Sequence, residues 1–331
     1  MSHYVFTLKF LTPVHFGNAH SGGKLEKAGY VCAADTLFSA LCVEADRQGA
    51  EKAAGFIEKF RQGRLSISSL YPYYRQDEVS ELELYLPKPF VYAKKQSGEL
   101  PGLAEMKVQA TAAKKEKKAL FVRASEIKGL YAGSLEALQQ RDFVAPALSV
   151  KVNCRGEQPL PYYVGSYLFA RGAGLYFVAY AAYEEDLREL QALTEFLGYS
   201  GVGGKRSSGY GKFSFFDDVF ELDGKSEICG KDDLVLAQML DDKVSSCQMC
   251  IAPLYPVCEA LDKVKAGTYK LLKRSGFVDG IAADNIKRQS IYMLAEGSCF
   301  QERLPGSMMQ LRAAGAGHPV YRNGLGMFVG L

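Results

Sequence analysis

Tryptophan is absent from the 331-residue sequence, histidine occurs only four times, and neither sign of charge dominates. Lysine and arginine together number 40 and aspartate and glutamate 37, so the formal net charge at pH 7 is +3. This small excess does not require a nucleic-acid partner, although it allows a local basic surface. The longest wholly apolar run, residues 175–183, is much shorter than the about 20 residues that span a bilayer, so we expect no membrane insertion.

No signal peptide is evident, because Met1 is followed at once by a strand-like segment. The eight cysteines are therefore expected to be reduced thiols in a cytoplasmic protein. Cys247, Cys250 and Cys258 offer three closely spaced sulfur ligands. A structural zinc site needs four ligands, usually as two short-spaced pairs, and no second pair follows. We predict buried thiols, no metal site and no cofactor.

Hydrophobic periodicity predicts a mixture of strands and helices, which is typical of an α+β protein. Residues 4–10 alternate as in a strand with one buried face. Asp35 is placed to cap a helix whose apolar stripe includes Leu37 and Leu41. The pattern further predicts a helix over 51–60, a strand over 65–74, a hairpin over 150–164, a helix from Glu184 to Gly198 and a strand over 212–216.

These elements fall into two sets with a polar stretch between them. Residues 1–220 fit a ferredoxin-like α+β sheet with long insertions, and residues 246–331 form a second α+β unit. Residues 221–245 are predicted to be a linker, within which residues 234–240 have helical character. Three acidic pairs are interpreted as solvated turns and not as a two-metal site: Asp217-Asp218, Asp232-Asp233 and Asp241-Asp242.

The composition changes at residues 96–118, which are small and charged and end in a run of lysine and glutamate. Such a segment is typical of a solvated helix or a surface loop. An arm that binds phosphate is the alternative, and the sequence leaves both open.

Five of the eleven residues in the segment 201–211 are glycine, with Lys205, Arg206, Ser207 and Ser208 between the two glycine clusters. Glycine lets a backbone approach another molecule closely, and we expect free amide N–H groups that point outward. With two cations and two hydroxyls, the segment is predicted to cradle phosphate oxygens. A mobile surface loop is the alternative. The segment is not a P-loop, because Lys205 is followed by Arg206, and it lacks the last glycine of a dinucleotide fingerprint.

Four stretches resemble the RAMP superfamily of CRISPR proteins, and in particular the family of the fourth subunit of the type III-A Csm effector complex. They are residues 10–17 (FLTPVHFG), 34–41 (ADTLFSAL), 201–213 (GVGGKRSSGYGKF) and a C-terminal group at 269–277, 295–300 and 318–324. The stretches span the whole chain in the expected order. The glycine-rich stretch alone indicates the superfamily, and the C-terminal group indicates the family.

The resemblance implies two ferredoxin-like (RRM-like) domains, the second of them modified. It also implies a non-catalytic, RNA-binding subunit that holds the 5′ repeat-derived tag of a guide RNA. The implied partners are this guide RNA, the large palm-domain subunit and the first copy of the backbone RAMP subunit, to which target cleavage belongs. The hairpin at residues 151–163 lies where the family has a thumb-like hairpin that bends the guide.

His15 is the basis of an alternative, enzymatic function. An imidazole on a glycine-flanked loop could act as the general base in metal-independent RNA cleavage, as in related RAMP endonucleases that process guide RNA. A contact to RNA and a purely structural role are the alternatives to catalysis. No other residue is predicted to be catalytic.

The predicted RNA-binding residues combine the resemblance with side-chain chemistry. Arg274 is favoured over Lys273 because of its planar donor fork, and for His318 a turn with Pro319 is the alternative. Tyrosines such as Tyr162 and Tyr163 could stack on unpaired bases. The full set is His15, Gly17, Ser39, Lys151, Asn153, Arg155, Gly201, Gly203, Gly204, Lys205, Arg206, Ser207, Ser208, Gly209, Tyr210, Arg274, His318 and Arg322.

Overall fold

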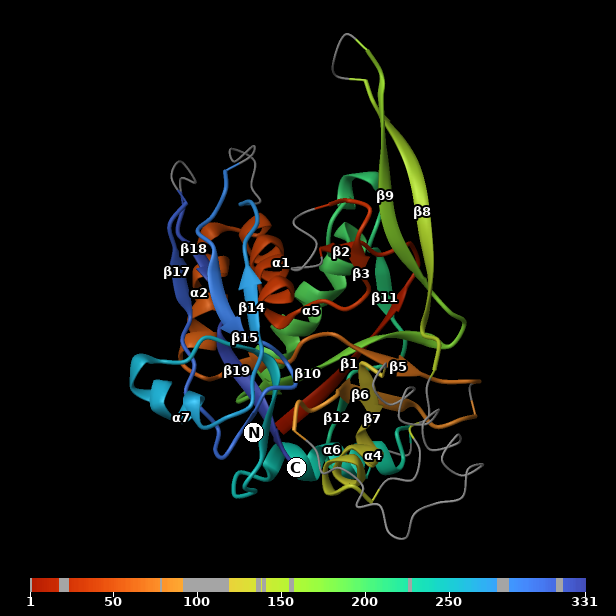
Figure 1. Ribbon diagram of the computed structural model, residues 1–331. Helices are drawn as coiled ribbons and strands as arrows, with labels where there is room; N and C mark the ends of the chain where they lie inside the picture. The colour runs from red at the N-terminus through yellow and green to blue at the C-terminus, as the bar shows by residue number, and fades with distance from the viewer. Residues whose placement is uncertain are drawn as a thin grey trace, which may run out of the picture.

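The computed structural model describes residues 2–17, 24–77, 79–91, 119–134, 138, 141–154, 158–225, 228–278, 286–313 and 318–331 (Figure 1). Helices and strands are mixed along the chain, as predicted for an α+β protein. No helix within these residues has both the length and the apolar character needed to cross a membrane. The segment 96–118 and the candidate Arg155 lie outside the described residues.

The larger sheet is organised around two antiparallel central strands, β1 and β10. In the described chain the strands run in the order β11-β1-β10-β5-β6-β7, with β12 beside β1 and β4 beside β10. One buried face is predicted for β1, but the whole stretch from Val5 to Leu8 is buried because both faces of the strand are covered. The bounds are β1 Ser2–Phe10, β4 Leu65–Ile67, β5 Tyr71–Tyr74, β6 Glu83–Pro87, β7 Phe121–Arg123, β10 Ala173–Ala181, β11 Phe213–Phe215 and β12 Phe220–Glu221.

The predicted strand over residues 65–74 is interrupted and forms two strands, β4 and β5, which both pair with β10. Ser68 lies at the break. Its N–H donates to the carbonyl oxygen of Val178, and its Oγ accepts from the N–H of Val178. The hydroxyl thus replaces a backbone carbonyl, so the polar groups of β10 stay satisfied across the break.

Three helices pack together beside this sheet: α1 (Ala34–Arg47), α2 (Ala50–Arg61) and α5 (Glu184–Ser200). The predicted apolar stripe of α1 is buried, including Leu37 and Leu41. Gly198 does not end α5 as predicted, because the helix continues to Ser200. A Cβ added to Gly198 would lie 2.5 Å from the carbonyl oxygen of Phe213, so glycine allows the helix to approach β11.

A second sheet follows, in which β13 (Gln248–Leu254) is central and fully buried. Its described strands run in the order β14-β15-β13-β16, with β19 on β13. The remaining bounds are β14 Leu271–Arg274, β15 Ile291–Leu294, β16 Cys299–Phe300, β17 Met309–Leu311, β18 Val320–Arg322 and β19 Leu325–Gly330, with the helical segments η2 Cys258–Ala260 and α7 Leu261–Lys265. α1 contacts β13 and β18, so this helix lies between the two sheets (Figure 1).

The predicted hairpin is formed by β8 (Val144–Asn153) and β9 (Leu160–Phe169), and it is longer than the sequence indicates. It projects from the body of the molecule (Figure 1). Near its base, Val14 exchanges two backbone hydrogen bonds with Tyr167 of β9. The hairpin is therefore tied to the chain that follows β1.

Residues 221–245, predicted to be a linker, contain folded structure. β12 pairs with β1, and α6 (Lys231–Asp241) contacts β19 and α4 (Ala124–Ala132). Leu236, Met239 and Leu240 of α6 are buried in the core. Local polarity is misleading here, because the apolar face of α6 is covered by elements distant in sequence.

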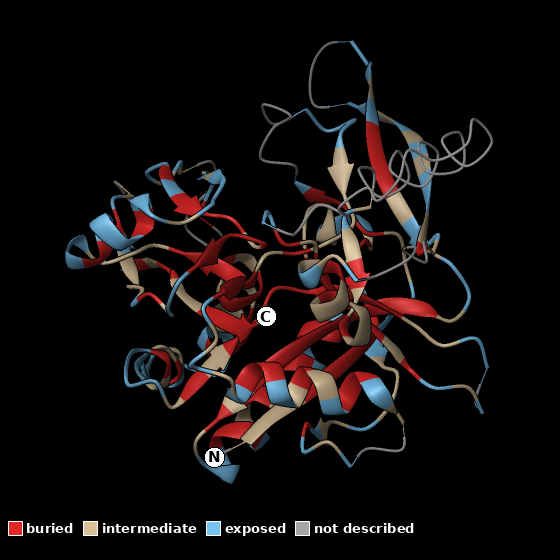
Figure 2. Ribbon diagram, turned by 60° about the horizontal axis from the view of Figure 1, so that its bottom comes forward, coloured by how far each residue is buried: buried red, intermediate tan, exposed pale blue. Residues whose placement is uncertain are grey.

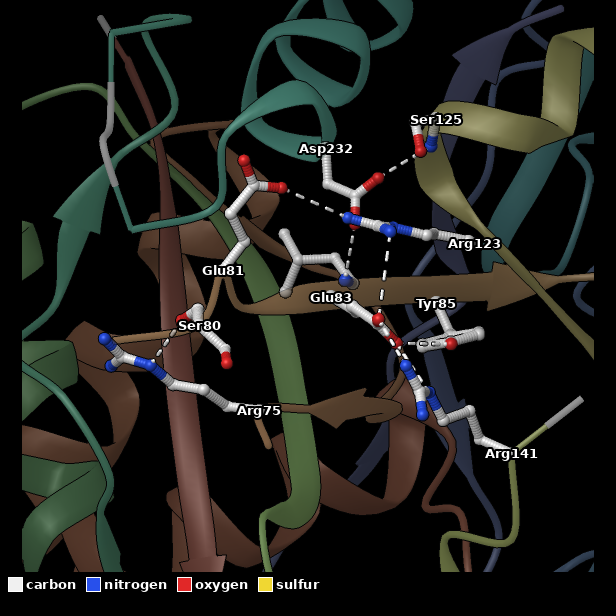
Figure 3. Close-up of polar contacts among 10 residues, drawn as sticks. Arg75, Ser80, Glu81, Glu83, Tyr85, Arg123, Ser125, Arg141 and Asp232 are labelled. Carbon is white, nitrogen blue, oxygen red and sulfur yellow. Dashed lines mark hydrogen bonds and ion pairs between the residues drawn. The ribbon is translucent and has the colours of Figure 1, made fainter. Parts of the chain in front are cut away.

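The interpretation of Asp232 and Asp233 as a solvated turn is wrong, since both side chains are fully buried. Asp232 accepts three hydrogen bonds: 3.0 Å from the N–H of Leu84, 2.9 Å from the N–H of Ser125 and 2.8 Å from Nε of Arg123 (Figure 3). The carboxylate thereby joins α6 to β6, to β7 and to the first turn of α4.

One apolar cluster extends through both sheets. It contains Phe6 and Leu37 from the first unit together with Met249, Ile251 and Val329 from the second. Figure 2 shows the buried segments meeting through the centre of the molecule. The two units therefore share a core.

Candidate nucleic-acid interface

A cleft of 2080 Å³ is lined by the glycine-rich segment, by α1 and α2, and by β14 of the second sheet. Cations line it from many parts of the sequence: Arg47, Arg61, Lys88, Arg206, Lys270, Arg274 and Arg288. Aromatic side chains stand among them: Tyr30, Tyr71, Phe90, Phe121, Tyr167, Phe277 and Tyr321. Cations beside aromatic faces form the usual surface for single-stranded nucleic acid, because the cations meet phosphates and the rings stack on bases.

The aromatic wall is preassembled around Tyr30. Its ring centroid lies 6.0 Å from that of Phe121 and 5.5 Å from that of Tyr167. Burial raises the pKa of Tyr30 to about 12, so its hydroxyl is neutral at physiological pH. On another wall, the guanidinium of Arg61 lies 4.6 Å above the ring centroid of Tyr321. That contact joins α2 to β18 beside the cleft.

The structure brings part of the predicted RNA-binding set together in this cleft. Seven of its members line the wall: Gly17, Ser39, Gly203, Gly204, Arg206, Arg274 and His318. Gly17 belongs to β2 (Phe16–Gly17), which pairs with β3 (Ala28–Gly29). Ser39 is on α1, where its Oγ donates to the carbonyl oxygen of Asp35 at 2.9 Å. His318 is exposed, and its Nδ1 lies 3.1 Å from the carbonyl oxygen of Pro319.

The glycine-rich segment is more ordered than predicted. Backbone hydrogen bonds use the N–H groups of Gly201, Val202, Gly204, Ser208, Gly209, Tyr210 and Gly211. The expectation of many outward-pointing amides is therefore wrong. Within the described chain Lys205 is the one non-glycine residue with positive φ, at 62°, and it precedes a short 3₁₀ turn, η1 (Arg206–Ser208). The segment presents side chains, notably those of Lys205 and Arg206, and few backbone amides.

The hydroxyls of the segment are at the surface. Ser207 and Ser208 are exposed, while Gly201 is buried behind them. A Cβ added to Gly209 would have no neighbouring atom within 4 Å, and the φ of this residue is 84°. None of these residues lines the cleft itself, and their contact with RNA stays a prediction.

His15 is held between the hairpin and the glycine-rich segment. Its Nδ1 lies 2.7 Å from the carbonyl oxygen of Gly165, which can only accept, so Nδ1 donates the proton. The backbone oxygen of His15 accepts from the N–H of Gly204 at 2.8 Å, and a Cβ on Gly204 would lie 2.7 Å from His15 Cδ2. Only 6% of His15 is exposed. These contacts favour a structural role for the imidazole.

One face of the hairpin is directed at the glycine-rich segment. Lys205 Nζ lies 4.9 Å from the ring centroid of Tyr162, and Lys151 Nζ lies 5.9 Å from that of Tyr210. Tyr210 is only 7% exposed, and its hydroxyl lies 3.4 Å from Ser149 Oγ, so its ring supports the hairpin and is poorly placed for stacking on a base. Asn153 is exposed near the tip of β8.

Asp35 does not cap α1. The residue before the helix is Ala33, and no side chain caps the helix there. Asp35 is fully buried and accepts hydrogen bonds from Arg274 of β14 and Arg322 of β18. Burial alone would raise the pKa of Asp35, but attraction to both guanidinium groups and their hydrogen bonds hold this pKa below its usual range.

These ion pairs change the interpretation of two of the predicted RNA-binding arginines, Arg274 and Arg322. Arg322 is 1% exposed and is committed to Asp35, so it does not offer a free guanidinium at the surface. Arg274 also pairs with Asp35, but 15% of its side chain remains exposed and it lines the cleft. Of the two, only Arg274 is placed to touch a ligand.

Glu296 was not predicted as a site residue. It lies in the turn after β15 and lines the cleft. Ser69 Oγ accepts from the N–H of Ala34 at 2.9 Å and lies 2.5 Å from Glu296 Oε1, so the hydroxyl donates its proton to the carboxylate. Nothing in the local sequence signals this contact, because Ser69 and Glu296 are 227 positions apart.

The prediction of buried thiols is confirmed for two of the three cysteines. Cys247 and Cys250 are buried free thiols, whereas Cys258 is exposed. Within the described residues, no group of three or more histidine, cysteine, aspartate or glutamate side chains is arranged to hold a metal ion.

A model of the CRISPR Csm4 C-terminal domain matches residues 243–331. The chain is 30% identical over 326 residues to the CRISPR system Cms protein Csm4 of Mycobacterium tuberculosis strain CDC 1551 / Oshkosh, an alignment that covers 96% of this chain and 94% of the relative. The chain belongs to the Csm4 family. Csm4 of Streptococcus thermophilus is 28% identical over 308 residues, with 92% of this chain and 93% of the relative covered.

Solved structures of Csm4-containing assemblies have a similar fold. One is a Csm3-Csm4 subcomplex of the type III-A CRISPR-Cas interference complex, with a TM-score of 0.61, 16% identity and 100% of this chain and 99% of that chain covered. Another is a Csm1-Csm4 cassette in complex with AMPPNP, with a TM-score of 0.59, 17% identity and coverages of 99% and 98%. At these identities the likeness establishes the fold of the Csm4 family along the whole chain.

Proposed function

We propose that this Csm4-family chain is a non-catalytic, RNA-binding subunit of a type III-A Csm complex and holds the 5′ repeat-derived tag of a guide RNA in the cleft. The observation that carries the proposal is the cleft itself, which is lined by arginines and lysines together with aromatic side chains. Phosphate contacts supply affinity, and unpaired bases stack and are read at their edges. Lys205, Arg206 and Lys151 extend the basic surface from the cleft toward the hairpin.

The connectivity supports the finer description of the fold. Apart from the elements inserted between them, the helices and core strands of the first unit follow the order β1-α1-β5-β10-α5-β11 along the chain. The core strands lie in the order β11-β1-β10-β5. A βαββαβ connection with this antiparallel order is ferredoxin-like. We propose residues 1–220 as this domain and 246–331 as a modified second copy, with 221–245 joining them as a folded connection.

The proposed partners follow from the family. Solved relatives of the chain are assembled with Csm1 or with Csm3. We propose the corresponding large palm-domain subunit and backbone RAMP subunit as neighbours of this chain, with the projecting hairpin directed along the guide. A cytoplasmic location remains our expectation for such a complex.

An endonuclease that uses His15 is the second candidate function. Its support is chemical, since Nε2 of the ring is not used by the hydrogen bond to Gly165. The burial of His15 counts against it, because a general base must come within hydrogen-bond reach of the proton it removes. Incubation of the purified chain with repeat-containing RNA and EDTA separates the two functions. Cleavage that disappears in His15→Ala would replace the binding proposal by the enzymatic one.

Retention of guide RNA tests the binding proposal. In the assembled complex, Lys205→Ala/Arg206→Ala should release tag RNA more readily and lower the dependence of binding on salt by about two in log–log slope. Lys263→Ala/Lys265→Ala is the matched control, because it removes two exposed cations from α7, outside the cleft. Equal retention in both double variants would remove the glycine-rich segment from the RNA path.

A further inference from the structure

An acidic side chain is unusual in the wall of a cleft that is meant for a polyanion. Three such side chains line the described cleft: Asp46, Glu58 and Glu296. Asp46 and Glu58 are exposed to water, which screens their charge. Glu296 is recessed, and burial raises its pKa above the usual value despite the hydrogen bond from Ser69. The fold therefore tolerates an unfavourable carboxyl group at this position.

Attraction to Arg274 lowers the pKa of Glu296, but it does not offset the opposite effect of burial. Among the described residues Glu296 forms no ion pair with a lysine, arginine or histidine. Arg274 lies in the same wall, but its Nε and Nη2 atoms are bonded to Asp35. Glu296 is thus a recessed carboxyl group that lines the cleft without a direct ion pair, and a raised pKa at such a place marks a functional position.

The orientation of Glu296 is nevertheless fixed. Ser69 Oγ accepts a hydrogen bond from the N–H of Ala34 at the start of α1 and donates a hydrogen bond to Oε1 of Glu296. The backbone N–H of the same serine donates to Ile251 O of β13 at 3.1 Å. Through Ser69, the carboxylate is thus connected to elements of both units, and these contacts restrict its orientation.

We propose that Glu296 determines base specificity in the cleft by accepting a hydrogen bond from the exocyclic amine of one unpaired nucleobase. This inference rests on the proposed function. A carboxylate repels phosphates but accepts well from the amine of cytosine, adenine or guanine. The single donor of uracil, N3–H, lies between two carbonyl oxygens that the carboxylate repels. The site therefore selects a base with an exocyclic amine and rejects uracil.

The test uses the assembled complex and guide RNAs whose 5′ tag is randomised. Bound RNA is recovered and sequenced. RNA bound by the wild-type complex should contain uridine about tenfold less often than the input RNA at one tag position. This is the discrimination expected of one good side-chain contact to a base edge. Glu296→Gln should reduce that depletion to about twofold or less and leave the total RNA retained unchanged, because an amide can also donate to a uracil carbonyl. Glu51→Gln, which changes an exposed glutamate of α2 outside the cleft lining, should keep the wild-type preference.

The outcomes separate this inference from the proposal on which it rests. If the wild type enriches tag sequences but Glu296→Gln shows the same uridine depletion at every position, Glu296 does not read a base and the cleft still binds RNA. If the wild type retains tagged and unrelated RNA equally, the proposed function fails and this inference with it. Should the glutamine variant not assemble, Glu296→Asp, which withdraws the carboxylate by one methylene, must show the same loss of discrimination.

Discussion

Arg274 holds the carboxylate of Asp35 with two nitrogen atoms, at 2.8 Å from Nε to Oδ2 and 2.7 Å from Nη2 to Oδ1. The two residues are 239 positions apart in the sequence. Asp35 also accepts from Arg322, so one buried carboxylate joins the first turn of α1 to β14 and β18. This junction fixes the two walls of the cleft relative to each other and holds Arg274 at its edge.

Removing the charge of Asp35 should destabilise the protein strongly. Asp35→Asn removes the charged carboxylate that binds both Arg274 and Arg322, so the free energy of unfolding should fall by about 3–5 kcal/mol. Urea denaturation measures the change. Asp46→Asn, an exposed substitution in the same helix, should change it by less than about 0.5 kcal/mol. A loss of under about 1 kcal/mol for Asp35→Asn would mean that the ion pairs contribute little.

The contribution of Asp35 should depend on pH. Burial alone would raise the pKa of Asp35, but Arg274 and Arg322 hold it below its unfolded value. The unfolded chain therefore takes up this proton at a higher pH than the folded chain. The stabilisation is complete above about pH 4, the usual value for aspartate, and is lost as pH falls through the folded pKa. The stability difference between wild type and Asp35→Asn should narrow in urea titrations below pH 4; a constant difference from pH 3 to 7 would contradict this.

Asp232→Ala tests whether residues 221–245 are part of the folded core. The variant loses three hydrogen bonds and deprives the partly buried Arg123 of the carboxylate that lies nearest to it, so we expect a loss of about 3–5 kcal/mol. Glu81→Ala removes another carboxylate near Arg123, but its side chain is 56% exposed and 3.4 Å from the guanidinium, so about 0–1 kcal/mol is expected. Similar unfolding curves for the two variants would argue for a loosely attached segment.

Gly211 and Gly209 form a matched pair in the glycine-rich segment. Both have positive φ, at 76° and 84°. A Cβ at Gly211 would lie 2.0 Å from the carbonyl oxygen of Val202, whereas nothing lies within 4 Å of a Cβ at Gly209. Gly209→Ala should cost about 1–2 kcal/mol from backbone conformation alone, and Gly211→Ala clearly more. Thermal unfolding of the two variants checks the order, and the reverse order would show that the segment is arranged differently.

Features that depend on local pattern could be predicted from the sequence. The apolar stripe of α1, the helix at residues 51–60 and the hairpin follow from side-chain spacing, and the structure has all three. The motif at 201–211 was placed correctly between α5 and β11. These predictions succeed because the residues that decide them are neighbours in the chain.

Features that depend on distant partners could not be predicted. Asp35 has the residue type and the position in the sequence that are typical of a helix cap, yet its partners are arginines more than 200 positions away. Asp232 looks solvated, yet β6, β7 and α4 cover it. Glu296 has no local signal at all, because Ser69 supplies its hydrogen bond. In each case the tertiary fold gives a charged residue its environment.

Photocrosslinking tests the central claim, that the cleft holds the 5′ tag of the guide RNA, most directly. A photoactivatable nucleotide is placed at each tag position of a guide RNA in the assembled complex, and the crosslinked peptides are mapped. Crosslinks are expected from tag positions to peptides of the cleft wall, in particular those containing Tyr30, Phe121 and Tyr321. Crosslinks from every tag position to other subunits, or to parts of this chain outside the cleft, would contradict it.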